Sequence, residues 1–465
     1  MLWLRILVAR RWLIVGLLAG AVVMLLPLDM PSPAAQRTLA MLATAIVFLI
    51  TEPIPLPATA LFIAVGQVVL ALGEPNEVAR SFMSDSVFFV MGSLMISVAI
   101  VKQKLDVRIA FGLMRLAGPS VGRLAVGMTT ISALLASVIG EHTVAAIMLP
   151  VVLGILKTVE EDQPHIPNLS VLLLLCIVYG CAIAGLGTPS GGARNAIVID
   201  YWRQLFDIRI DYATWVAYAY PMVILQIPFV PLVLWWTYRP EVRDLKRSLV
   251  RLRREVRGRG QLSQRDFHVI GLFLVVLLGW ITLSGTLGLG MVAIAGAGLY
   301  LATGLVRWDD LNSGVNWGVV WLYAAAISLG VQVKQTGTAE WLANHLLGIM
   351  GPMPSIGVLL IIALLMVLFT NIMSSGAAVA VLGSITLQMA EISGTSLIAA
   401  GFVTALASAF AFFTSFASPA AMIVYSSGRL QPSDFARSGG KLVVASVAML
   451  MLLAWAYWPW LGLGQ

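Results

Sequence analysis

The chain has 465 residues, of which 59% are hydrophobic and only 11% are charged. Soluble domains carry roughly 25% charged residues, so this composition excludes a soluble globular protein. The net charge of +7 does not indicate a nucleic-acid partner, because a chain buried in lipid cannot present a basic face to a duplex.

Apolar segments long enough to cross a bilayer recur from one end of the chain to the other, which predicts an all-α polytopic membrane protein. Continuous spans are predicted at 12–28, 38–52, 55–73, 86–103, 213–236, 266–285, 288–305, 316–333 and 441–461. We expect Met1–Leu28 to be a retained first span. Four further apolar segments, 122–157, 168–199, 354–390 and 396–425, are interrupted by polar and small residues.

Basic residues in the loops predict the orientation. The loop at 237–265 is rich in arginine, which places it in the cytoplasm. Counting spans from this loop puts the N-terminus in the cytoplasm and the C-terminus outside. The basic residues near the N-terminus and at 102–123 then fall on the cytoplasmic side too. Short cytoplasmic loops without a visible organelle signal favour a bacterial inner membrane.

The chain also repeats itself. Val101-Lys102-Gln103 recurs as Val333-Lys334-Gln335, and Gly187-Thr188-Pro189 pairs with Ala417-Ser418-Pro419 at nearly the same spacing. The expected topology puts the first Val-Lys-Gln inside and the second outside. The two halves are therefore predicted to be inverted relative to each other, as they are in many secondary transporters.

This repeat predicts four parts of the chain. They are an N-terminal span with the first external loop (1–37), a first repeat (38–236), a basic cytoplasmic linker (237–265) and a second repeat (266–465). Each repeat should contain a re-entrant hairpin, at 122–157 or 354–390, followed by a broken helix, at 168–199 or 396–425. Interrupted backbone at membrane depth is tolerated only inside protein or beside a watery cavity, so we expect the four interruptions to meet at one site. Helix N-termini at that site favour an anion.

Several stretches carry a family resemblance. They are LITEPIPLPATALF (49–62), SDSVFFVMGSLMISVAIVKQKLDVRIAFGLM (84–114), the hairpin around GEHT, GTPSGGARNAI (187–197), NWGVVWLYAAAISLGVQVKQTGTAEWLA (316–343), the hairpin around SSG, and SPAAMIV (418–424). In these the chain resembles the divalent anion:sodium symporter family, which includes di- and tricarboxylate and sulfate carriers. The resemblance implies about eleven transmembrane helices plus two re-entrant hairpins, a homodimer, and elevator-type transport of a small anion.

The hairpin tips depart from the family pattern. Family members carry Ser-Asn-Thr at each tip, where it binds sodium and a substrate carboxylate. This chain has Glu141-His142-Thr143 at the first tip and Ser374-Ser375-Gly376 at the second, so Thr143 and Ser374 alone keep the family residue type. In the broken helices Thr188 and Asn195 are kept and Ser418 is the partner of Thr188, whereas Arg194 and Ala420 stand where prolines are expected and Ala421 where an asparagine is expected.

These residues predict the site. Substrate-binding candidates are His142, Thr143, Thr188, Arg194, Asn195, Ser374, Ser375 and Ser418; coupling candidates are Glu141, His142 and Arg194. Sodium takes oxygen ligands, which Arg194 and Gly376 do not supply, so we expect weak or absent sodium dependence and no other metal or cofactor. A guanidinium suits a carboxylate or a sulfate, and a histidine next to a glutamate suits proton coupling.

Alternatives stay open on sequence alone. Glu141, His142 and Arg194 could form a buried cluster that only holds the hairpin tip against the broken helix. Backbone carbonyls could still build sodium sites and support sodium-coupled dicarboxylate or sulfate symport. A transport-inactive sensor or scaffold is the third possibility. An enzyme is not expected, because the remaining histidines are scattered and no nucleophile stands next to a base.

Overall fold

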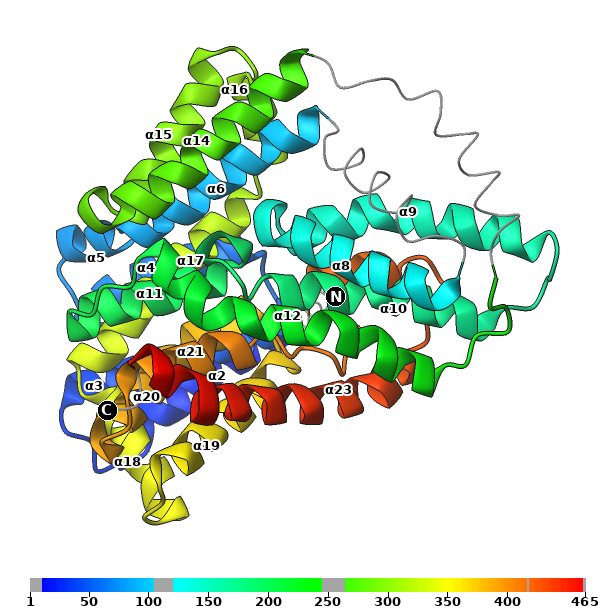
Figure 1. Ribbon diagram of the computed structural model, residues 1–465. Helices are drawn as coiled ribbons and strands as arrows, with labels where there is room; N and C mark the ends of the chain where they lie inside the picture. Colours follow the sequence, from blue (N-terminus) through cyan, green and yellow to red (C-terminus); the bar gives the residue numbers. More distant parts are fainter. Residues whose placement is uncertain (1–10, 104–119, 245–263, 416–417, 463–465) are drawn as a thin grey trace, which may run out of the picture.

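The computed structural model describes residues 11–103, 120–244, 264–415 and 418–462, and these residues form an all-helical bundle (Figure 1). Nine described helices are long and apolar enough to cross a membrane, or ten if α18 and α19, bent by 112°, count as one. The predicted all-α polytopic fold is therefore confirmed.

Six of the nine long helices coincide with predicted continuous spans, whereas α9, α10 and α20 lie in segments predicted to be interrupted. Long enough to cross are α3 (Pro33–Thr51), α6 (Asp85–Lys102), α9 (Glu141–Glu160), α10 (Pro167–Ala184), α12 (Tyr212–Thr237), α14 (Gln264–Leu287), α17 (Trp317–Gln335), α20 (Ser375–Ser393) and α23 (Pro432–Leu452), whose last turns continue to Leu461. The other helices include α2 (Arg11–Leu25), α4 (Leu56–Val69), α8 (Val121–Ile139), α11 (Ala193–Phe206), α15 (Leu289–Ala302), α18 (Thr338–Met350), α19 (Ser355–Thr370), α21 (Leu397–Ala407) and α22 (Pro419–Tyr425). The expected spans at 12–28, 55–73 and 288–305 correspond to α2, α4 and α15.

Two helical hairpins lie at the positions where the sequence is interrupted. In the first, Gly140 alone separates α8 from α9, with φ 85° and ψ 147°, a backbone conformation that side chains oppose. The two helices pack against each other, so the chain reverses direction at this residue. In the second, α19 and α20 also pack together, and Ser374 caps α20 by accepting a hydrogen bond from the Ala377 amide.

Both predicted broken helices are interrupted in the structure. Helix α10 ends at Ala184, and a short turn at Pro189–Gly191 precedes α11. Helix α21 ends at Ala407, and α22 begins again at Pro419. Helices α10 and α20 are the most enclosed of the described spans, so the first break and the second hairpin lie deep within the protein.

Helix α11 is held in the interior by aromatic side chains. The Tyr201 hydroxyl lies 3.0 Å from the Ala326 carbonyl of α17 and 2.9 Å from the Ala380 carbonyl of α20, and both carbonyls can accept from it. On the neighbouring face Trp202 packs edge-on against Phe402 of α21. These contacts fix the helix that follows the first break against three helices of the second half of the chain.

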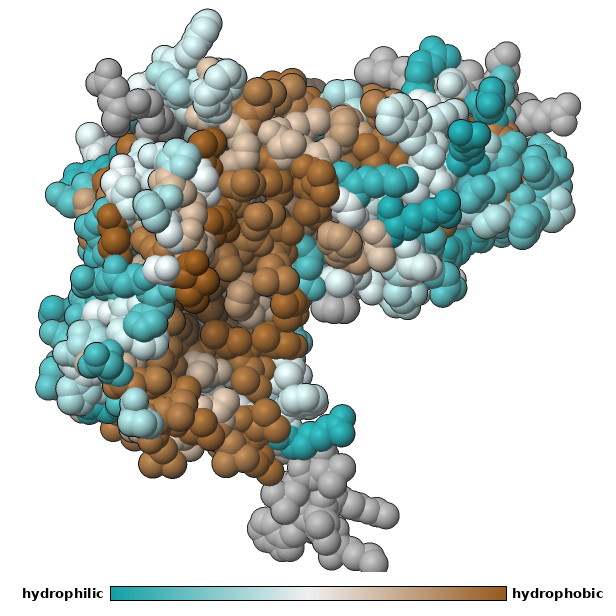
Figure 2. Space-filling model, turned by 90° about the horizontal axis from the view of Figure 1, so that it is seen from below, coloured by the Kyte–Doolittle hydropathy of each residue, from teal (hydrophilic) through white to brown (hydrophobic). Residues whose placement is uncertain are grey.

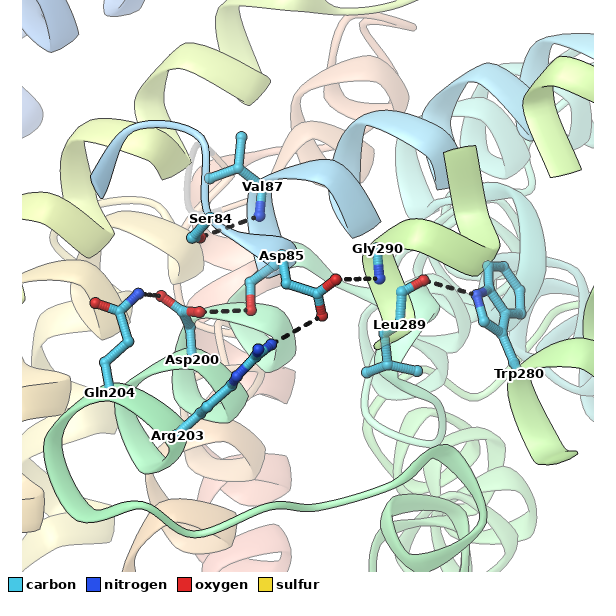
Figure 3. Close-up of polar contacts among 10 residues, drawn as sticks. Ser84, Asp85, Val87, Asp200, Arg203, Gln204, Trp280, Leu289 and Gly290 are labelled. Atoms are coloured by element: carbon cyan, nitrogen blue, oxygen red, sulfur yellow. Dashed lines mark hydrogen bonds and ion pairs between the residues drawn. The ribbon is translucent and has the colours of Figure 1, made fainter. Parts of the chain in front are cut away.

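Polar contacts tie the far end of α11 to α6 and α15 (Figure 3). Asp200, almost fully buried, accepts hydrogen bonds from Ser86 and Gln204. Arg203 forms an ion pair with Asp85 at 3.3 Å, and Asp85 also accepts from the Gly290 amide at 3.1 Å. This network satisfies the buried carboxylate fully, which makes it a structural tie outside the cavity described below.

The molecular surface is that of a membrane protein. Figure 2 shows a broad hydrophobic band over one hollowed face, with hydrophilic residues gathered to either side. Large exposed side chains such as Leu61 and Val65 of α4 and Leu278 of α14 are apolar. Such surfaces face lipid in polytopic proteins.

Each Val-Lys-Gln lysine has an acidic partner. Lys102 forms an ion pair with Asp310 in the short helix α16 (Trp308–Gly314), and this contact holds the pKa of the Asp310 carboxyl below its usual value. Lys334 forms an ion pair with Glu391 at 3.1 Å. The basic residues near the N-terminus, at 104–119 and at 245–263 lie outside the described residues. The division into repeats, the orientation and the elevator motion remain predictions.

Candidate functional site

The first helix break is closed by two residues predicted for the site. The Thr188 hydroxyl donates to the Ser137 carbonyl at 2.8 Å. The Asn195 amide donates to the carbonyls of Gly185 and Thr188 at 2.7 and 2.8 Å. Carbonyls released by a helix break need such partners when they are buried. Thr188 and Asn195 therefore shape the loop that carries Arg194.

Arg194 lies buried at this break with unused hydrogen-bonding capacity. Its side chain is 4% exposed, and its Nη2 donates to the Ala182 carbonyl at 3.4 Å. Its Nε has no hydrogen-bond partner in the part of the chain that the structure describes. Side chains on Gly185 or Gly192 would collide with the guanidinium, so these two glycines make room for it. Burying a charged group with an unused hydrogen-bond donor costs free energy unless a ligand or another group accepts that hydrogen bond.

Glu141 and His142 line a cavity of about 120 Å³ at the tip of the first hairpin. Helices α6 and α17 and the first break complete its wall, with Ser93, Tyr323 and Ser190 among the lining residues. Each water molecule in the liquid occupies roughly 30 Å³, so this volume corresponds to about four waters. The cavity is thus of the size of a small, compact anion.

Arg194 and Glu141 attract each other without touching. Their charges interact electrostatically. The ion pairs within 4 Å among the described residues lie elsewhere, so the predicted pair is an attraction through space and not a salt bridge. Thr143, half-buried on the next position of α9, does not line the cavity.

The serines of the second hairpin are held within the hairpin, Ser374 by α20 and Ser375 by the end of α19. The Ser374 hydroxyl accepts from the Ala377 amide at 3.3 Å. Ser375 lies 3.1 Å from the Thr370 hydroxyl, which donates to the Ser408 carbonyl at 2.6 Å. A serine hydroxyl that accepts a capping bond keeps its own hydrogen to donate. Ser374 therefore remains able to donate to an anion.

The second break meets the first hairpin. Ser418, 3% exposed, caps α22 by accepting from the Ala421 amide at 3.1 Å. Helix α22 packs against α9 and α10, and Pro419 lines the same cavity as Glu141 and His142. The start of α22 therefore lies at the same cavity as the first hairpin tip.

Sequence reasoning missed the walls that α6 and α17 contribute. Ser93 of α6 lines the cavity, and its buried hydroxyl has no partner. Tyr323 and Asn316 of α17 line it too. Both helices belong to the repeated stretches around Val-Lys-Gln, so the repeat itself held the signal. That signal was interpreted as topology and not as a site.

A bundle of spanning helices thus encloses a cavity, a hairpin tip, two helix breaks and a buried guanidinium. This combination is typical of a membrane transport protein. Comparisons with known proteins agree with this class. The model of the sodium:sulfate symporter transmembrane region matches residues 8–463. The chain belongs to this family of transporters.

Curated relatives resemble the chain along most of its length. An uncharacterized transporter of Haemophilus influenzae is 25% identical, covering 92% of each chain. The sodium-dependent high-affinity dicarboxylate transporter 3 of Caenorhabditis elegans is 24% identical, covering 89% of this chain and 82% of the relative. The sodium-dependent dicarboxylate transporter SdcS of Staphylococcus saprophyticus is 23% identical, covering 96% of this chain and 91% of the relative.

Solved structures agree on the fold. The YdaH transporter of Alcanivorax borkumensis superposes with a TM-score of 0.56 at 13% identity, covering 83% of this chain and 88% of that one. MtrF of Neisseria gonorrhoeae gives a TM-score of 0.51 at 10% identity, covering 81% and 83%. At these identities the likeness concerns the fold alone.

Proposed function

We propose that this chain transports small divalent anions, with a dicarboxylate as the leading substrate class and sulfate or a tricarboxylate as the others, and that it does so without sodium. Exchange or proton coupling supplies the driving force. The observation that carries the proposal is Arg194, a buried cation at the first break whose Nε has no partner among the described residues. Arg194 does not itself line the cavity, but the nearby Gly191 and Gly192 do.

Arg194 performs the task that a bound cation has in other anion carriers. A permanent positive charge at membrane depth lowers the energy of a dianion there, and a guanidinium can bind a carboxylate through two donors. Thr188 and Asn195 position its loop. His142, Thr143, Ser374, Ser375 and Ser418 are proposed as further donors from the hairpins and the second break.

Glu141 and His142 are proposed as the coupling pair. They are adjacent at the first hairpin tip and both line the cavity, so a proton taken up there changes the charge that the anion meets. Ionisable residues inside a membrane mark substrate paths or proton relays by default. Anion entry should therefore depend on pH over the range in which histidine and glutamate side chains titrate.

Sodium-coupled symport is the second candidate, because one observation favours it. The Asn195 Oδ1 is buried at the first break without a partner, and an unused amide oxygen is a suitable sodium ligand. Two of the relatives described above are named sodium-dependent. The same experiment must therefore distinguish the two couplings.

We propose further properties from the family resemblance and from the charge of the loops. They are a homodimer, elevator motion of one part of each half, and residence in a bacterial inner membrane with the N-terminus cytoplasmic and the C-terminus outside. Crosslinking of purified protein and accessibility of cysteines introduced in the loops test them.

Counterflow in proteoliposomes tests the transport proposal. Vesicles are loaded with unlabelled succinate, citrate or sulfate in choline buffer, and entry of the labelled anion is followed across a range of pH. We expect accumulation of at least one anion without sodium. Accumulation that requires sodium would favour the second candidate, and no accumulation in either buffer would favour a sensor or scaffold.

A further inference from the structure

Tyr323 is a cavity residue to which no role has yet been assigned. It projects from α17 and lines the cavity together with Glu141 and His142. Its ring is half-buried. Its hydroxyl, unlike those of Tyr201 and Tyr300, makes no hydrogen bond to the described residues. The hydroxyl is therefore free to bind something in the cavity.

The second hairpin is shaped around this phenol. A Cβ on residue 376 would lie 2.5 Å from the Tyr323 Oη and 2.8 Å from its Cε1. The backbone of Gly376 is not in the left-handed region, so glycine is needed here for space and not for conformation. The Tyr323 hydroxyl occupies the space that a side chain of residue 376 would fill at the start of α20.

Tyr323 is also within electrostatic range of the two charged residues Arg194 and Glu141 of the first half of the chain. Tyr323 interacts electrostatically with Arg194 and with Glu141. Arg194 belongs to the first break, whereas Tyr323 stands against the second hairpin. A ligand that contacts both groups must therefore reach from one half of the site to the other.

We propose that Tyr323 is a specificity-determining residue whose hydroxyl donates a hydrogen bond to the end of the anion that is remote from Arg194. This inference rests on the proposed transport function. A dicarboxylate has two charged ends and can satisfy Arg194 and Tyr323 together. Sulfate is compact and satisfies Arg194 without reaching Tyr323. Tyr323 thus selects two-ended anions.

Binding to purified full-length protein tests this role, with succinate and sulfate as probes and Tyr323→Phe as the variant. A hydrogen bond to a charged group contributes enough that its loss weakens binding about tenfold. We expect the Kd for succinate to rise about tenfold and that for sulfate to change less than threefold. Tyr300→Phe is the matched control, because its hydroxyl donates to the Val269 carbonyl away from the cavity.

Three results separate the two proposals. An unchanged succinate Kd in Tyr323→Phe overturns the role of Tyr323. An equal loss for succinate and sulfate overturns the selection of two-ended anions. If the wild-type protein binds neither probe, while remaining folded and monodisperse, then the transport proposal itself has failed.

Gly376 gives an independent test that does not remove the hydroxyl. Gly376→Ala should push the phenol from its place and weaken succinate binding, whereas Gly298→Ala in α15, which meets nothing within 4 Å, should not. In a Tyr323→Ala background, Gly376→Ala should have no further effect. Equal loss of affinity on both backgrounds would contradict the contact, and unchanged affinity in Gly376→Ala alone would do so as well.

Discussion

The two hairpin tips occupy corresponding places and are built from opposite chemistry. The first carries Glu141 and His142, follows a glycine without a side-chain cap, and interacts electrostatically with the buried Arg194. The second begins with a capping serine, and residues 370–390 contain no Asp, Glu, Lys, Arg or His. The Ser374 hydroxyl accepts from the backbone of α20, and the Ser375 hydroxyl accepts from the Thr370 side chain. The ionisable side chains are thus at the first hairpin tip, and the second hairpin tip has neutral hydrogen-bond donors.

This difference indicates which hairpin recognises the charge of the anion and which recognises its shape. A fixed charge that is buried without full compensation is expensive, and proteins keep such groups where a ligand completes them. Neutral hydroxyls at a helix start cost little and stabilise the helix whether or not a ligand is present. We therefore assign charge recognition and coupling to the first half, and shape and end recognition to the second half with Tyr323.

Removing the positive charge of Arg194 should cause the largest loss of anion affinity. Arg194→Leu deletes the only arginine at the first break, and loss of a two-donor contact to a carboxylate weakens binding by roughly 100-fold or more. Calorimetry with succinate measures it. Arg203→Leu is the matched control on the same helix, because Arg203 pairs with Asp85 away from the cavity. Similar losses in both variants would contradict a special role for Arg194.

Asp200 offers a contrast to Arg194, because both oxygens of its buried carboxyl group have hydrogen-bond partners. Asp200→Ala leaves Ser86 and Gln204 without their acceptor, which should cost about 1–3 kcal/mol of stability. Asp200→Asn keeps an acceptor and should cost less. Thermal unfolding in detergent measures both. If Asp200→Asn abolished transport without lowering the unfolding temperature, the charged site would extend beyond the first break and tip.

Much of this arrangement could be predicted from the sequence, for physical reasons. Hydropathy places the spans, and Gly140 or Pro189 inside apolar segments marks the interruptions, because each disrupts a helix locally. The missed features are tertiary. Helix α18 lies between the predicted span at 316–333 and the interrupted segment at 354–390, where no helix was predicted. The contact between Tyr323 and Gly376 joins residues far apart in sequence. No local pattern encodes which side chain fills the space left by a glycine.

A smaller effect is expected from the second tip. Ser374→Ala removes the cap of α20 and should cost about 1 kcal/mol of stability. It also removes one neutral donor, so anion affinity should fall roughly threefold. Ser396→Ala, which removes the cap of α21, is a control for stability alone. A loss of affinity as large as that in Arg194→Leu would contradict the division of tasks.

The smallest effect concerns the ion pair beside α16. The pKa of Asp310 is held below its usual value chiefly by the hydrogen bond from Lys102. A carboxyl whose folded pKa is lowered stabilises the fold above its unfolded pKa, and this contribution is lost as the pH falls through the folded value. Asp310→Asn should therefore slightly reduce stability near neutral pH and not at acid pH. An equal loss at both would show that the charge is not responsible.

The claim that Arg194 replaces a bound sodium ion is tested most directly by the Kd for succinate. It is measured in sodium chloride and in choline chloride at equal ionic strength. If Arg194 supplies the positive charge at the site, the two values agree within about twofold, and the Arg194→Leu variant binds poorly in both. If the Kd falls at least tenfold in sodium, a cation site exists that the protein builds from backbone and amide oxygens, and Arg194 does not replace it.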